Sequence, residues 1–182
     1  MNIIYEDNHL ILVNKTPGEL SQSDITKDLS LVDELKNYLK IKYEKKGNVY
    51  LGLVNRLDRP TSGILIFAKT SKSLTRMNKL FKTRDIKKTY YAITEKCPGQ
   101  VNGQIINHLK KNQSKNKSFV VNRDDPKSKK AILNYKLIKK LKNYFLLEII
   151  LETGRHHQIR CQLSNIGCHI KGDIKYGAKR PN

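Results

Sequence analysis

Apolar residues occur along the whole chain in short runs, and their spacing constrains the fold more than any other feature. Most runs alternate with polar residues or span only about four to eight residues, which is typical of strands. Helical spacing is confined to three stretches, which begin near Ser30, near Ser71 and after Gly154. Because these helices do not alternate strictly with the strands, the pattern predicts an α+β fold, in which a few helices flank a mixed, largely antiparallel sheet.

Local signals give the expected boundaries of these elements. Ser30 and Asp33 match the pattern of a capping box, and Ser71 is expected to cap the second helix. Gly167 lies where a cap at the end of the third helix belongs. The expected strands, of which the first two form a hairpin, are residues 3–5, 10–13, 63–69, 88–94, 131–137 and 144–151.

The net charge of the chain indicates the class of its partner. Lys and Arg total 36 against 16 Asp and Glu, which gives a formal charge of +20. Such an excess strengthens binding to phosphate whatever its origin, so it favours a nucleic-acid partner over a merely lysine-rich composition. Residues 107–130 are rich in lysine and poor in apolar residues, apart from residues 119–121. They are expected to form a solvated loop with one short strand, which could also contact phosphate.

Length and cysteine content set further bounds. A chain of 182 residues is expected to form a single domain over residues 1–182. Its three cysteines, Cys97, Cys161 and Cys168, lack the spacing of a disulfide framework, which favours a reducing compartment. The sequence shows neither a secretory signal nor an apolar run of membrane-spanning length. We therefore expect a soluble cytoplasmic protein with no membrane partner.

One carboxylate occurs in a setting that suits chemistry. Asp58 lies between Arg56 and Arg59 and precedes a Pro-Thr-Ser-Gly turn, which leads into an apolar run. Nearby positive charge favours the ionised form of a carboxylate, and an oriented carboxylate can act as a nucleophile. The spacing is equally compatible with an Asx-turn, in which Asp58 would only cap its own loop.

Two further segments could bind an anion or a base. Residues 152–160 place Arg155 and Gln158 among other donors at the start of a helix, where the dipole favours a phosphate or a carboxylate. The same residues could instead only face solvent. Tyr90 lies on an expected strand, where it could pack in the core or stack on an exposed RNA base.

Metal and cofactor motifs are weak or missing. His157 and Cys161 face one side of the last expected helix, and Cys168 and His169 follow it. These are acceptable zinc ligands, but structural zinc sites normally contain tighter ligand pairs, so no metal is expected. The sequence also lacks a phosphate-binding P-loop, a dinucleotide-binding glycine pattern and a Gly-x-Ser-x-Gly elbow. No cofactor is expected either.

Three segments, taken in order, resemble the core motifs of RNA pseudouridine synthases of the RluA type. They are residues 55–63, 88–92 and 154–160. Residues 4–18 are similar to the first hairpin of that family, and residues 167–177 resemble the segment after its last motif. The likeness spans nearly the whole chain, and three motifs in sequence are more specific than any one of them.

The resemblance implies that the chain isomerises specific uridines to pseudouridine in structural RNA, either tRNA or rRNA. Asp58 would engage the flipped nucleotide covalently, at C6 of the base or C1′ of the sugar, or would assist glycal formation. Tyr90 would lie against the target base and assist removal of the C5 proton, Arg160 would pair with Asp58, and Ile159 would pack on the base. The other substrate-binding residues would be Asn55, Arg56, Arg155 and Gln158.

The implied reaction is redox-neutral, so the resemblance implies neither a metal nor a cofactor. The target base would have to leave the helix, at a cost of roughly a few kcal/mol that phosphate contacts can offset. We expect a monomer without a separate RNA-binding module. Target choice would then depend on the catalytic domain itself, chiefly on residues 19–29 and 107–130.

The chain departs from the family pattern at several positions. Asn55 stands where the family commonly has His, Gln162 where it has His, and His169 where it has Pro. Family members usually continue past Gly177 into further strands, whereas this chain stops at Asn182, so it is either a minimal member or C-terminally short. A second interpretation is therefore a catalytically weak or inactive RNA-binding protein or RNA chaperone on the same fold. A basic structural protein of ribosomes ranks behind both.

Overall fold

The computed structural model describes residues 1–23 and 28–181. Contacts divide the chain into two compact units, Met1–Asp85 and Ile86–Asn182. Both units combine helices with antiparallel strands, which confirms the predicted α+β class. The single domain over residues 1–182 stays a prediction. Residues 24–27, which belong to the loop expected over residues 19–29, lie outside the described residues.

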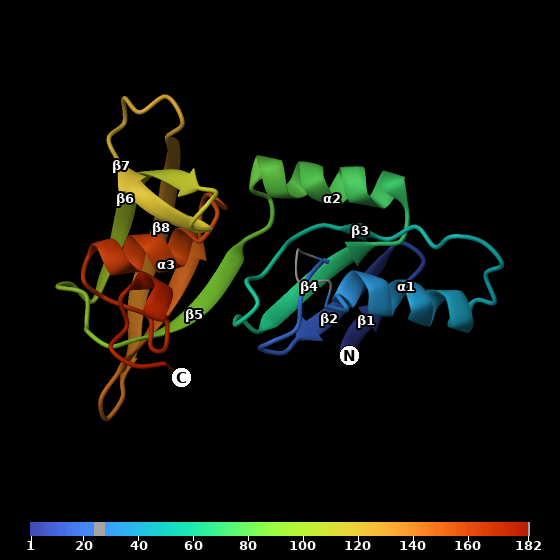
Figure 1. Cartoon of the computed structure of the whole chain (residues 1–182), viewed down its shortest axis with the longest axis horizontal. Helices are drawn as coiled ribbons and strands as arrows, with labels where there is room; N and C mark the ends of the chain where they lie inside the picture. The colour runs from blue at the N-terminus through green and yellow to red at the C-terminus, as the bar shows by residue number, and fades with distance from the viewer. Residues whose placement is uncertain (24–27, 182) are drawn as a thin grey trace. The chain divides into compact units, whose positions relative to one another are not determined.

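Among its described residues, the first unit contains a four-stranded antiparallel sheet in the order β1-β2-β4-β3 (Figure 1). Its strands are β1 Ile3–Glu6, β2 Leu10–Lys15, β3 Gly52–Leu53 and β4 Gly63–Ala68. The predicted hairpin of β1 and β2 is confirmed. The Asp7 carboxylate closes its turn by accepting hydrogen bonds from the backbone N–H groups of His9 and Leu10. β2 and β4 pair along their whole length at the centre of the sheet.

Both helices of the first unit begin with a capping box. They are α1 Leu31–Lys42 and α2 Ser71–Thr83. The box predicted from Ser30 and Asp33 is confirmed, because each side chain accepts a hydrogen bond from the other residue's backbone N–H. Thr70 caps the second helix, so the prediction of Ser71 is wrong by one residue. Thr70 has the extended backbone of a cap, whereas Ser71 is already helical.

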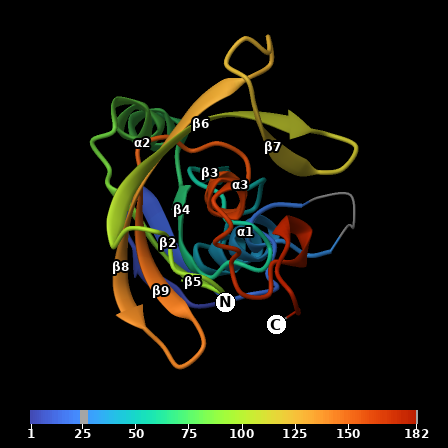
Figure 2. The same cartoon turned by 90° about the vertical axis from the view of Figure 1, so that its left-hand side faces the viewer.

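In the second unit, the described residues form a five-stranded antiparallel sheet in the order β5-β9-β8-β6-β7 (Figures 1 and 2). Its strands are β5 Lys88–Thr94, β6 Asn102–Asn112, β7 Lys117–Val121, β8 Lys129–Lys140 and β9 Phe145–Leu151. The loop expected over residues 107–130 is therefore wrong in part, because β6 and β7 pair as a hairpin there. Lysines conceal this strand in the sequence, since Ile105 and Leu109 are its only buried apolar residues.

One α-helix, α3 Gln158–Asn165, packs on a face of the five-stranded sheet in the described part of the second unit (Figure 1). A short 3₁₀ helix, η1 Ile174–Tyr176, follows it. Gly167 ends α3 as predicted, with a left-handed φ of +74° that glycine adopts without a steric cost. The buried apolar cluster between α3 and the sheet consists of Leu163 of α3 and Ala92, Ile105, Leu133, Leu147 and Ile149 of the strands. None of the described helices is long and apolar enough to cross a membrane.

Candidate functional site

The loop that carries Asp58 connects β3 to β4 in the first unit, and a buried lysine fixes its backbone. Lys15 lies at the end of β2 and donates from Nζ to the carbonyl oxygens of Arg59, at 2.9 Å, and Thr61, at 2.7 Å. The backbone N–H of Thr61 in turn donates to the carbonyl of Asp58 at 2.9 Å. The half-buried Asp58 therefore begins a turn whose far side is held by Lys15.

Lys15 is a functional candidate that sequence reasoning missed. Its side chain is completely buried. Burial lowers the pKa of Lys15, and the carboxylates of Glu19 and Asp58 oppose this effect. The sequence did indicate a buried lysine at this position. Ile11, Val13 and Lys15 occupy every second position of β2, so their side chains all point into the core. A lysine at the inward position of a strand indicates a specific buried partner.

A second set of bonds joins the Asp58 loop to residues 18–21. The Ser21 hydroxyl donates to the carbonyl of Leu57 at 2.9 Å and accepts from the backbone N–H of Leu57 at 3.3 Å. Gly18 donates its N–H to the carbonyl of Arg59 at 2.8 Å, and Arg59 Nε donates back to the carbonyl of Gly18 at 3.0 Å. The guanidinium of Arg59 also lies 2.9 Å from the Asp28 carboxylate. The loop is thus fixed on both sides of Asp58.

Asn55 continues the pairing of β3 with β4 beyond the end of β3. Its carboxamide donates to the carbonyl of Ile64 at 3.0 Å and accepts from the N–H of Ile66 at 2.8 Å. Val54, just before it, donates its N–H to the carbonyl of Ile66 at 2.9 Å. Asn55 therefore holds the start of the Asp58 loop on the sheet, and its expected contact with substrate stays a prediction. Arg56, the next residue, is exposed.

Tyr90 and Ile159 lie close to the same apolar cluster of the second unit. Tyr90 is half-buried on β5 and pairs with Ile149 of β9. Ile159 lies in the first turn of α3. Both side chains pack against the buried cluster that includes Leu163. The structure therefore brings two of the predicted substrate-facing residues to one region of this unit.

The guanidinium of Arg160 is held by Asp173, a residue that sequence reasoning did not identify. Arg160 donates from Nε to Oδ2 at 2.7 Å and from Nη2 to Oδ1 at 2.8 Å. The guanidinium also lies 5.0 Å from the centre of the Tyr176 ring. Burial raises the pKa of Tyr176 to about 12, so its hydroxyl is neutral at physiological pH. The pairing of Arg160 with Asp58 stays a prediction.

Gln158 organises the loop before α3. It is 3% exposed, and its carboxamide oxygen accepts from the Thr153 hydroxyl at 2.8 Å and the backbone N–H of Arg155 at 2.9 Å. Its amide nitrogen donates to the carbonyl of Ile132 at 3.1 Å. The exposed Arg155 donates from Nε to the carbonyl of Lys130 at 2.9 Å. Direct contact of Gln158 or Arg155 with substrate stays a prediction, and the geometry gives Gln158 a positioning role.

The residues considered as zinc ligands make other contacts. His157 Nδ1 lies 3.0 Å from the Tyr176 hydroxyl, and Cys161 Sγ lies 3.3 Å from the carbonyl of Ser118. Over residues 1–23 and 28–181, no group of three or more His, Cys, Asp or Glu side chains is arranged to hold a metal ion. All three cysteines are free thiols.

Comparison with known proteins relates the chain to a single family. Residues 9–165 match the family model described as RNA pseudouridylate synthase. The chain is 38% identical over 178 residues to ribosomal large subunit pseudouridine synthase C of Rickettsia prowazekii. This alignment covers 97% of this chain and 56% of the relative. The chain is 34% identical over 182 residues to ribosomal large subunit pseudouridine synthase D of Zymomonas mobilis, with coverage of 99% and 57%. The chain thus spans a little more than half the length of these curated relatives.

Solved structures give the same result. The structure matches human RNA pseudouridylate synthase domain containing 4 with a TM-score of 0.81 and 27% identity, over 96% of this chain and 68% of that one. It also matches human RNA pseudouridylate synthase domain containing 1 with a TM-score of 0.77. At 20% identity, this second match shows a shared fold alone.

Proposed function

Because the chain belongs to the RNA pseudouridylate synthase family, we propose that it isomerises uridine to pseudouridine in RNA. The observation that carries this proposal is the half-buried Asp58 carboxylate, in a loop whose backbone is fixed by Lys15 on one side and Ser21 on the other. Such a carboxylate is oriented before substrate binds, which is what a nucleophile requires. The names of the relatives favour the RNA of the large ribosomal subunit as substrate over tRNA.

The proposed reaction exchanges one bond of the nucleotide for another. The bond between N1 of the base and C1′ of the sugar breaks, the base rotates, and C5 bonds to C1′. C5 loses a proton and N1 gains one, so the product is an isomer of the substrate. No electron donor, metal or cofactor is needed to balance these steps.

Each predicted catalytic residue has one role in this scheme. Asp58 engages the target nucleotide, at the base or at the sugar. Tyr90 lies against the target base and assists removal of the C5 proton, and its packing with Ile159 on one apolar cluster supports a shared base-facing role. Arg160 supplies a positive charge to the reaction, and the Asp173 carboxylate fixes the orientation of its guanidinium.

The remaining predicted residues hold the RNA. Arg56 and Arg155 are exposed cations that can bind the phosphates of the RNA. The formal charge of +20 on the chain also favours RNA binding. Asn55 binds backbone groups of β4, and Gln158 accepts from the backbone N–H of Arg155, which supports an indirect contribution through the positions of Asp58 and Arg155.

We further propose that the protein acts as a metal-free monomer in the cytoplasm. Three free thiols suit a reducing compartment, and large-subunit RNA is the substrate named for the relatives. Light scattering during size-exclusion chromatography measures the mass in solution. A single species near the chain mass of 21.0 kDa is expected, and a species of twice that mass would contradict the proposal.

Release of tritium tests the proposed activity. Ribosomal RNA transcribed with 5-³H-uridine loses tritium to water when C5 bonds to C1′. We expect release with the wild-type chain and none with Asp58→Asn, which keeps the shape of the side chain but not its charge. Asp85→Asn is the matched control, because it removes one exposed carboxylate from the same unit. RNA binding without release by the wild type would favour the inactive RNA-binding interpretation.

A further inference from the structure

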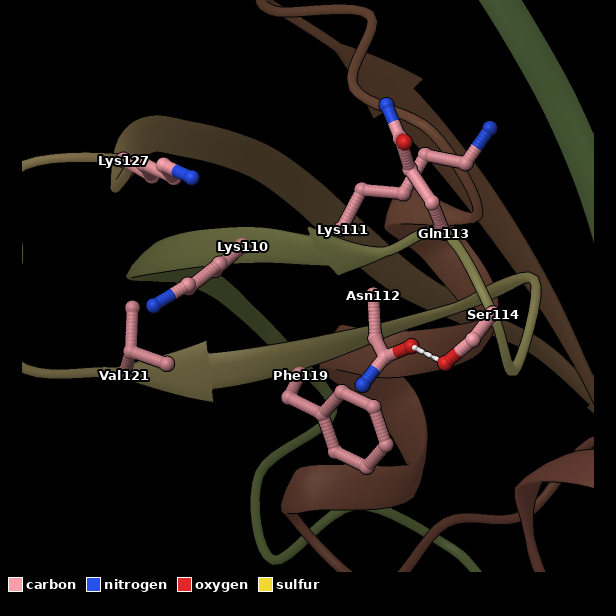
Figure 3. A pocket seen from close by; sticks show the side chains of 8 residues that line it. All are labelled: Lys110, Lys111, Asn112, Gln113, Ser114, Phe119, Val121 and Lys127. Carbon is pink, nitrogen blue, oxygen red and sulfur yellow. Dashed lines mark hydrogen bonds between the residues drawn. The ribbon is translucent and has the colours of Figure 1, made fainter.

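The β6–β7 hairpin and the loop after it line an open pocket in the second unit, with a volume of about 530 Å³ (Figure 3). We name this surface the hairpin pocket. Its lining residues are Lys110, Lys111, Asn112, Gln113, Ser114, Phe119, Val121 and Lys127. Three lysines, two carboxamides, a hydroxyl and an aromatic ring thus line one concavity, and none of these residues belongs to the predicted catalytic set.

Positive charge is concentrated around the hairpin pocket. Residues 107–130 contain seven Lys and one Arg against two Asp. The Asp125 carboxylate accepts from Lys110 Nζ at 2.7 Å, which fixes that lysine at the edge of the pocket. The side chains of Lys111 and Lys127 are exposed (Figure 3). A field of this sign favours a polyanion as the occupant.

An aromatic ring is exposed in the same pocket. Phe119 and Val121 alternate with Ser118 and Val120 along β7, so the two pairs face opposite sides. Val120 packs on the core, whereas Phe119 is 37% exposed. Lys117 Nζ lies 5.6 Å from the centre of this ring. An exposed aromatic ring among lysines is the combination on which single-stranded nucleic acids stack.

The hairpin is fixed to the loop that precedes α3 and to η1. The Ser118 hydroxyl donates to the carbonyl of His156 at 2.7 Å, and the Ser118 N–H donates to the Tyr176 hydroxyl at 2.8 Å. Asn116 Oδ1 lies 3.2 Å from Nε2 of His156. A ligand held in the hairpin pocket is therefore held in a defined position relative to Arg155, the residue before His156.

We propose that the hairpin pocket binds an unpaired nucleotide of the RNA other than the target uridine. The base stacks on Phe119, and Lys110 and Lys127 contact the flanking phosphates. The carboxamide of Asn112, which lies on the same side of the hairpin as Phe119, faces the base edge. The occupant is RNA because the positive charge disfavours a cationic or purely apolar partner, and an exposed ring stacks on an unpaired base. The inference takes only the ligand class from the proposed function, and it requires no turnover.

The first test measures how salt weakens RNA binding. The affinity of the Asp58→Asn protein for a short fluorescein-labelled single-stranded RNA is measured at a series of salt concentrations, with and without the further substitutions. We expect Lys110→Gln with Lys127→Gln to reduce the slope of log affinity against log salt by about 1.4, since each phosphate contact on a single strand contributes about 0.7. An unchanged slope would overturn the assignment.

Lys139→Gln with Lys140→Gln is the matched control for charge. These exposed lysines lie at the opposite end of β8 from Lys129, about 30 Å away at the usual rise per residue. This double substitution also removes two positive charges, and we expect it to leave the slope of log affinity against log salt unchanged. An equal fall in slope for both pairs would show that only net charge matters and would overturn the hairpin pocket as a site.

The second test isolates the aromatic ring. Phe119→Ala is expected to weaken binding of single-stranded RNA roughly ten-fold or more while leaving the salt slope unchanged, because stacking involves no phosphate. Binding of a fully paired duplex of the same sequence should change much less. Phe119→Leu, which keeps an apolar side chain on β7, serves where the alanine variant unfolds, and it should also lose affinity. Equal affinity of wild type and Phe119→Leu for single-stranded RNA would contradict stacking.

These tests fail independently of the proposed function. Absence of tritium release by the wild type would contradict isomerisation and leave the effects on RNA affinity intact. Conversely, tritium release with no effect of the substitutions on affinity would support the isomerase and overturn the hairpin pocket alone.

Discussion

Arg160 and Asp173 form a two-point ion pair in which the side chains are only 17% and 9% exposed. Replacing Asp173 with Asn removes the charge and one of the two acceptor positions for the guanidinium. We expect the free energy of unfolding to fall by about 2 kcal/mol, because a charge-assisted bond in a largely buried site is lost.

Turnover should also fall in Asp173→Asn, because the guanidinium of Arg160 then loses the two-point ion pair that sets its orientation. Arg160→Lys is the companion variant, since an ammonium cannot make the two parallel bonds of a guanidinium. Denaturant unfolding and tritium release measured on both proteins check the prediction. Wild-type turnover in both would show that the orientation of Arg160 does not matter for the reaction.

Lys15 provides a second prediction, on the Asp58 loop itself. Lys15→Met keeps the length of the side chain but removes the donor for the carbonyls of Arg59 and Thr61. We expect a loss of about 1–3 kcal/mol of stability, the usual cost of leaving a buried polar group unpaired, together with slower turnover. Thermal unfolding and initial rates of tritium release measure the two effects. A stable variant with the wild-type rate would mean that Lys15 does not set the position of Asp58.

Asn55 and Arg56 are neighbours with different expected roles. Asn55→Ala removes two bonds to the backbone of β4, so we expect it to lower the free energy of unfolding by about 1–2 kcal/mol. Arg56→Ala removes an exposed cation and should weaken RNA binding with little change in stability. Unfolding and RNA affinity are measured for both. If Asn55→Ala weakened RNA binding at unchanged stability, Asn55 would contact the RNA directly.

Glu6 gives a prediction on pH. Burial would raise its pKa, but hydrogen bonds from Lys42, Lys69, Tyr43 and Tyr38 lower it to about 2. A carboxylate whose pKa is lowered by folding stabilises the native state above its unfolded pKa, and this contribution is lost as the pH falls through the folded value.

The contribution of Glu6 should be about 2 kcal/mol at neutral pH and should disappear between roughly pH 5 and pH 2. Unfolding of wild type and Glu6→Gln is compared across that range. The difference between the two proteins should shrink as the pH falls, and a difference independent of pH would contradict the role assigned to the Glu6 charge.

Features set by neighbouring residues were predictable from the sequence. The capping box of Ser30 and Asp33, the hairpin of β1 and β2, and the Gly167 cap depend on residues only a few positions apart. The position of Asp58 just before a strand followed in the same way from the turn and the apolar run after it.

Features set by distant partners were not predictable. Lys15 binds carbonyl groups more than forty residues away, and no local pattern pairs it with Arg59 or Thr61. Asp173 reaches Arg160 only because the chain turns back after Gly167. The whole of β6 was missed, because its pairing with β7 and β8 outweighs the low strand propensity of its lysines.

Direct detection of pseudouridine tests the central claim most directly. Unmodified large-subunit ribosomal RNA is incubated with the wild-type chain or with Asp58→Asn, and its nucleosides are separated and counted. We predict that, with the wild type, the amount of uridine lost equals the amount of pseudouridine formed. Asp58→Asn should form no pseudouridine. Pseudouridine formed by Asp58→Asn, or none formed by a wild-type chain that binds the RNA, would contradict the account.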